Sequence, residues 1–206
     1  MTPVLDHAAR ERILAAVRAA EAQTSAEIRV VVLSRPLIRH SFYPVLWAAL
    51  AALALPWLLV LAVPLRPIPL LAVQGLIFLA LLALLSVPAL ARRTVPPAVR
   101  QAAARAAALD RFLALGIHLT ESRTGLMILA AAPDRLIEVV ADETILAKLG
   151  PGVCEEVCAV VSKAAADGDL SGALAAGVNQ AGIRLSETFP ASAQDRNELP
   201  DHVIFA

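Results

Sequence analysis

Three acidic residues beside a predicted strand have side chains that could bind a cation. Asp134 precedes the strand expected over residues 136–141, and Asp142 and Glu143 follow it directly. Carboxylate oxygens are the ligands that hard divalent cations prefer, so these three are the candidate ligands for a divalent metal. We favour ordinary solvated acids, because the sequence has no glycine-rich phosphate loop and no HExxH helix. We therefore assign no catalytic residue and no metal from the residues themselves.

The two cysteines have the spacing of neighbours on a helix. Cys154 and Cys158 are four residues apart and share one face of the helix predicted over residues 154–167. Without a nearby histidine or a further cysteine they are an incomplete ligand set for zinc, which takes four ligands. Two cysteines also do not make a disulfide framework. We predict a buried pair in the core.

Arg123 stands directly before another predicted strand, next to Thr124 and Gly125. Its guanidinium has the geometry to bind an anion or a lipid headgroup. A surface or structural ion pair is the alternative, and it is the interpretation that we favour.

The elements that position these residues lie on both sides of an apolar insert. Before the insert, apolar residues at helical spacing predict a helix over residues 4–22, and β-branched residues predict a strand over residues 27–33. One helix and one strand cannot bury a core alone. Their partners must therefore come from the chain after the insert.

The second part of the chain supplies those partners. In chain order we predict a helix from Pro96 to Gly116, strands over 124–131 and 136–141, and helices over 154–167 and 170–187. Pro133 to Arg135 predict a turn, so the two strands should form an antiparallel hairpin in which Glu138 faces the same side as Val140. The predicted fold class is α/β, a small mixed sheet packed with helices. Its domain comprises residues 1–40 and 92–190, followed by an irregular tail, 191–206.

The insert, residues 41–91, has the composition of membrane-spanning segments. The chain of 206 residues is 58% hydrophobic and 17% charged, but the insert contains one charged residue, Arg66. An uncharged helix over 44–65 would be about 33 Å long, enough to cross a hydrocarbon core of about 30 Å. Residues 68–91 form a second such stretch, and three prolines between the two favour a reversal. The insert therefore predicts a two-helix transmembrane hairpin.

Arginines on both sides of the insert predict its orientation. The candidate residues for the membrane interface are Trp47, Arg39, Arg66, Arg92 and Arg93. Seven arginines flank the two spans and only Arg66 lies between them, so the positive-inside rule places both termini on the cytoplasmic side. Trp57 lies deeper in the first span.

The expected partner is the lipid bilayer rather than nucleic acid. The formal net charge is zero, and binding to nucleic acid depends on a strongly basic face. Within the two spans Gln74 is the one strongly polar side chain, whereas transporters and proton relays need intramembrane polar groups. This composition favours an anchor or a surface for other membrane helices.

Several segments resemble the TPM domain family, the family of the thylakoid phosphatase, a photosystem repair factor and the MOLO receptor modulator. The resemblance lies in residues 24–31, 112–116, 120–128, 136–142, 189–190 and 197–201. It is to the bacterial membrane-anchored branch, whose domain is interrupted by a transmembrane hairpin after the first strand. The resemblance implies a TPM-like fold in the bacterial inner membrane. The resemblance also implies phosphatase activity, with a divalent metal in an acidic cleft as in some members of the family. This chain has Asp142 to Thr144 where other branches have a glycine-rich turn after the last strand.

From these observations we expect an accessory or assembly subunit of a larger membrane protein complex. The polar-poor spans suit helix packing, and the resemblance includes proteins that maintain photosystems. The alternative is a membrane-tethered, metal-dependent phosphatase that uses Asp134, Asp142 and Glu143.

Overall fold

The computed structural model of this chain describes residues 5–37, 42–62, 66–120, 122–191 and 203–205. The chain divides into two compact units. Residues 1–37 and 101–206 form an α/β unit, and residues 38–100 form a helical unit.

The α/β unit is built on a small mixed sheet with the strand order β3-β2-β1-β4. Strand β1 (Glu27–Leu33) pairs in parallel with β2 (Gly125–Ala131), and β2 pairs antiparallel with β3 (Leu136–Ala141). A two-residue strand, β4 (Ile204–Phe205), adds in parallel to the other edge of β1. The predicted antiparallel hairpin of β2 and β3 is thus confirmed.

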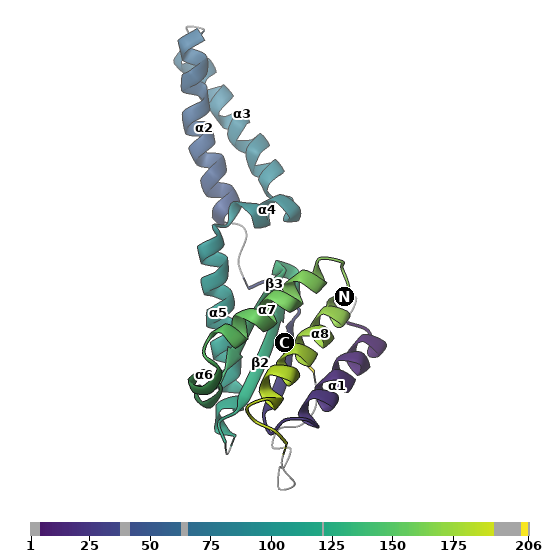
Figure 1. The fold of residues 1–206 in the computed structure, drawn as a ribbon. Coiled ribbons are helices and arrows are strands. Elements are labelled where there is room, and N and C mark those ends of the chain that lie inside the picture. The colour runs from purple at the N-terminus through teal and green to yellow at the C-terminus, as the bar shows by residue number, and fades with distance from the viewer. Residues whose placement is uncertain (1–4, 38–41, 63–65, 121, 192–202, 206) are drawn as a thin grey trace. The chain divides into compact units, whose positions relative to one another are not determined.

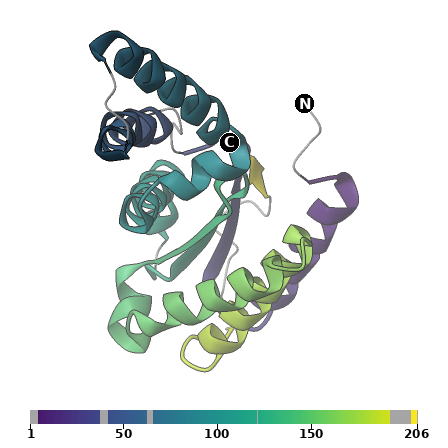
Figure 2. The ribbon, with the colours of Figure 1, turned by 90° about the horizontal axis from the view of Figure 1, so that it is seen from above.

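Helices cover both faces of this sheet (Figures 1 and 2). On one face lie α1 (His7–Glu21), α7 (Gly152–Ala165) and α8 (Leu170–Ser186). On the other face lies α5 (Pro97–Ala114), which ends two residues before Gly116, and Gly116 has a left-handed conformation. Short helical segments complete the unit: η1 (Ile117–Leu119), η2 (Ala132–Asp134) and α6 (Glu143–Leu149).

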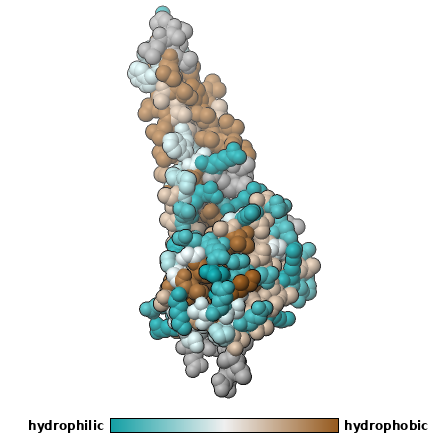
Figure 3. Space-filling view, in the orientation of Figure 1, coloured by the Kyte–Doolittle hydropathy of each residue, from teal (hydrophilic) through white to brown (hydrophobic). Residues whose placement is uncertain are grey.

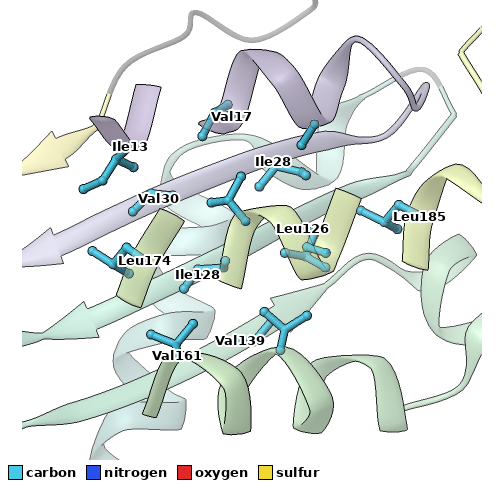
Figure 4. Close-up of a cluster of buried hydrophobic side chains, with 14 of the residues drawn as sticks. Ile13, Val17, Ile28, Val30, Leu126, Ile128, Val139, Val161, Leu174 and Leu185 are labelled. Carbon is cyan, nitrogen blue, oxygen red and sulfur yellow. The ribbon is translucent and has the colours of Figure 1, made fainter. Parts of the chain in front are cut away.

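Alternate strand residues enter two separate hydrophobic clusters. Ile28, Val30, Leu126 and Ile128 pack against α1, α7 and α8 (Figure 4). Their neighbours in the strands, such as Val31, pack with Ala108 and Phe112 of α5 in the second cluster. The period of two in the strands therefore gives the sheet two apolar faces, and each needs its own layer of helices.

The helical unit contains α2 (Phe42–Ala62), α3 (Pro67–Leu85) and α4 (Pro88–Thr94). Helices α2 and α3 pack against each other, and α2 uses a buried stripe of compact residues four apart: Pro44, Ala48, Ala52 and Pro56. Hydrophobic residues cover the visible face of both helices (Figure 3). In the described part of the chain, α3 alone is long and apolar enough to cross a membrane, and none of it is buried.

Some predicted boundaries were wrong in the structure. The second apolar stretch does not continue as one helix to residue 91: α3 ends at Leu85, and Pro88 begins α4. Proline cannot donate a backbone hydrogen bond, which explains a new helix start at this position. Helix α6 and strand β4 were not predicted at all.

Candidate functional site

Asp134 has a structural role at the carboxyl ends of β1 and β2. Its side chain is buried, and its Oδ2 accepts a hydrogen bond of 2.6 Å from the backbone N–H of Leu37. This bond attaches the segment that leaves β1 to the segment that leaves β2. The carboxylate is therefore already used to satisfy a backbone donor.

Asp142 and Glu143 lie at the other end of β3. Asp142 caps α6, its Oδ1 accepting a hydrogen bond of 2.7 Å from the backbone N–H of Glu143, and its buried Oδ2 has no hydrogen-bond partner among the described residues. The Glu143 side chain is largely exposed and lies 3.6 Å from the guanidinium of Arg123. The ion pair expected for Arg123 is thus present.

The three acidic candidates do not form one site. Strand β3 has six residues and separates Asp134 from the other two by about 20 Å. In the described ranges no three His, Cys, Asp or Glu side chains are arranged to hold a metal ion. The structure therefore does not bring together the ligand set suggested by the sequence.

A groove instead runs along β3, an edge strand, with a volume of about 550 Å³. It lies between α5, which contributes Arg105, and α7, which contributes Cys154, Cys158 and Ser162. Glu138 of β3 also lines it. Both cysteines are half-buried at the margin of the hydrophobic core, so the prediction of a buried core pair was wrong.

Side chains hydrogen-bond to the backbone groups of β3 that face away from β2. The Cys158 thiol donates to the carbonyl oxygen of Ile137 at 3.4 Å, and Arg105 Nη1 donates to that of Val139 at 3.3 Å. The backbone of Ala141 hydrogen-bonds to Cys154. Because an open strand edge can pair with another chain, these contacts protect the edge from unwanted pairing.

Burial and nearby charged groups set the pKa values of the two thiols. Arg105 pairs with Glu138 at 3.1 Å, which confirms that Glu138 faces α5 as Val140 does. Burial raises the pKa of the Cys154 thiol above its ordinary value, although the Arg105 guanidinium opposes the rise. Burial also raises the pKa of Cys158, against the opposing effect of a hydrogen bond from Ser162. Both thiols therefore stay protonated at neutral pH.

Sequence reasoning missed the role of Arg105, which it treated as a flank of the membrane insert. No local signal pairs it with Glu138, 33 residues away. Arg29 was also counted among the flanking arginines, but it is buried within β1. The folded positions of these two side chains are decided by the sheet and not by the insert.

The predicted interface residues that the structure describes lie in the helical unit. Trp47 is partly exposed, and its Nε1 donates a hydrogen bond of 3.0 Å to the carbonyl oxygen of Thr94 in α4. Arg66 precedes α3 and Arg93 lies in α4, both exposed. The backbone of Arg92 also belongs to α4, whereas Arg39 lies outside the described residues.

Comparisons with known proteins identify the fold. No protein-family model and no curated protein matches this chain. Among solved structures, the chain is similar to the NMR structure of the BA42 protein from the psychrophilic bacterium Bizionia argentinensis. The TM-score is 0.64 at 17% identity, over 100% of this chain and 98% of that chain. At this identity the similarity shows a shared α/β fold alone.

Proposed function

We propose that this protein is a membrane-anchored accessory subunit of a larger membrane protein complex. In this proposal α2 and α3 form a two-span hairpin in the bacterial inner membrane, and the α/β unit is a TPM-like domain on the cytoplasmic side. The observation that carries the proposal is α3, a 19-residue apolar helix without a buried residue. Such a surface is stable in lipid or against other apolar helices, and not in water.

One face of α3 suits a partner helix. Gly75 is exposed, and a Cβ added to it would meet no atom within 4 Å, so it does not serve the contact with α2. Ile68, Leu71 and Leu79 are exposed on the same side of the helix. Small residues in membrane helices let a second helix approach closely. Gly75 therefore marks the face for which we propose a partner.

The experiment is a mild-detergent pull-down of the tagged native protein, with the co-purifying chains identified by mass spectrometry. We expect stoichiometric partners to co-purify with the wild type. Gly75→Val should remove them, because the branched side chain of valine blocks the close approach of a partner helix to α3. Ala80→Val is the matched control, since Ala80 is exposed about 140° around the helix from Gly75. Recovery of the protein alone, or equal yields from both variants, would contradict the proposal.

Orientation has a separate test. A reporter that is active only in the periplasm, fused after Ala206, should stay silent if the termini are cytoplasmic. Activity of this fusion would reverse the proposed orientation.

The phosphatase alternative loses its three-carboxylate site, because Asp134 lies at the opposite end of β3 from Asp142 and Glu143. Metal-dependent phosphate release that falls when Asp142 is replaced by alanine would restore that alternative.

A further inference from the structure

The groove beside β3 has two thiols on one wall. Cys154 and Cys158 are one helical turn apart on α7, so their Cβ atoms are about 5–6 Å apart. Both line the same cavity of about 550 Å³. Their hydrogen bonds to the backbone of Ala141 and Ile137 fix both sulfurs beside the edge strand. Both thiols therefore line one wall of the groove and are reachable from outside the core.

Two sulfurs without a third ligand suit a soft ion of low coordination number. Thiolates select Cu(I), whereas zinc completes a set of four ligands. In the part of the chain that the structure describes, no third His, Cys, Asp or Glu completes a metal-binding group. We propose that Cys154 and Cys158 bind one Cu(I) ion between their sulfurs.

Binding of Cu(I) changes the charge in the groove. Each S–H releases its proton to solvent as its S–Cu bond forms, and the copper stays in the +1 state throughout. The two thiolates and Cu(I) then carry one net negative charge. Arg105 of α5 faces it with a positive charge, and Glu138 of β3 and Glu155 of α7 face it with negative charges. Because protons are displaced, copper affinity rises with pH.

The experiment uses the full-length protein in detergent, with reduced thiols and without oxygen. Cu(I) is added in complex with a chromogenic chelator, so that withdrawal of copper is read from the loss of colour. We expect one Cu(I) per chain and two sulfur ligands by X-ray absorption. Cys154→Ser and Cys158→Ser should each weaken binding by about a hundredfold or more, because the second thiolate no longer acts within the same molecule.

Ala159→Ser is the matched control, because Ala159 is exposed in the same groove and the change leaves both sulfurs in place. Its copper affinity should stay close to that of the wild type. A second measurement needs no variant: bound Cu(I) should protect both thiols from alkylation by N-ethylmaleimide. The proposal is wrong if the chelator keeps the copper, if either serine variant binds as wild type, if alkylation is unchanged, or if Zn(II) binds more tightly than Cu(I).

Discussion

Gly177 of α8 packs directly against Val161 of α7, so closely that a Cβ at residue 177 would overlap Cγ2 of Val161. The same helix meets α1 at Gly182, where a Cβ would lie 2.7 Å from the Cβ of Ala20. Two glycines five residues apart thus let α8 lie between two other helices. This contact fixes the layer of helices that covers the first apolar face of the sheet.

Gly177→Ala should destabilise the protein by about 1–3 kcal/mol, despite the higher helix propensity of alanine, because the methyl group overpacks this contact. Chemical denaturation measures the change. Gly152→Ala is the control, since a Cβ there meets nothing within 4 Å and should be neutral or slightly stabilising. Adding Val161→Ala to Gly177→Ala should recover part of the loss. Additive effects of the two substitutions would show that they do not share this contact.

Asp134 and Glu143 should differ sharply as alanine variants. Asp134→Ala leaves the Leu37 N–H without its acceptor and should cost about 1–3 kcal/mol of unfolding free energy. Glu143→Ala removes an exposed ion pair and should change stability by less than about 1 kcal/mol. Thermal and urea denaturation of both variants tests the difference. Equal stability of the two variants would contradict the structural role of Asp134.

Asp169 should make stability depend on pH in the acid range. The backbone N–H of Gly172, the Ser171 hydroxyl and Arg12 lower its pKa to about 2. A lowered pKa in the folded state means that the stabilisation is complete above the ordinary value near 4 and is lost as the pH falls through about 2. The Tm of Asp169→Ala should therefore lie below that of the wild type at pH 5, and the gap should narrow toward pH 2. A constant gap would contradict this assignment.

Trp47 and Trp57 should report two depths in a bilayer. Ten residues of helix separate them by about 15 Å along the axis of α2. In vesicles that contain brominated lipids, Trp57→Phe leaves Trp47 as the one tryptophan, and shallow bromines should quench it best. The reciprocal variant, Trp47→Phe, should be quenched best by deeper bromines. Equal quenching profiles would mean that α2 lies along the membrane surface instead of crossing it.

Local patterns in the sequence predicted much of the fold. Short apolar runs located β1, β2 and β3 to within one residue, and a proline-containing turn predicted the hairpin. The alternation in β3 also placed Glu138 on the side of Val140. These features depend on neighbouring residues, so the sequence carries them directly. Helix α6, by contrast, was not predicted. It has only seven residues, and its signal in the sequence was the N-cap residue Asp142, followed by the apolar residues Ile145 and Leu149.

The sequence by itself determined which segments are apolar and which residues share a face of an element. Tertiary structure alone decided that the Asp134 carboxylate accepts a hydrogen bond from the backbone of Leu37, and that β4 forms by pairing with β1. It also decided that Cys154 and Cys158 line a groove. Their spacing shows that they share a face of the helix, but it does not show whether they lie at the centre of the buried face or at its margin. Which residues lie at the margin depends on the helices and strands that pack beside them, and these come from distant parts of the chain.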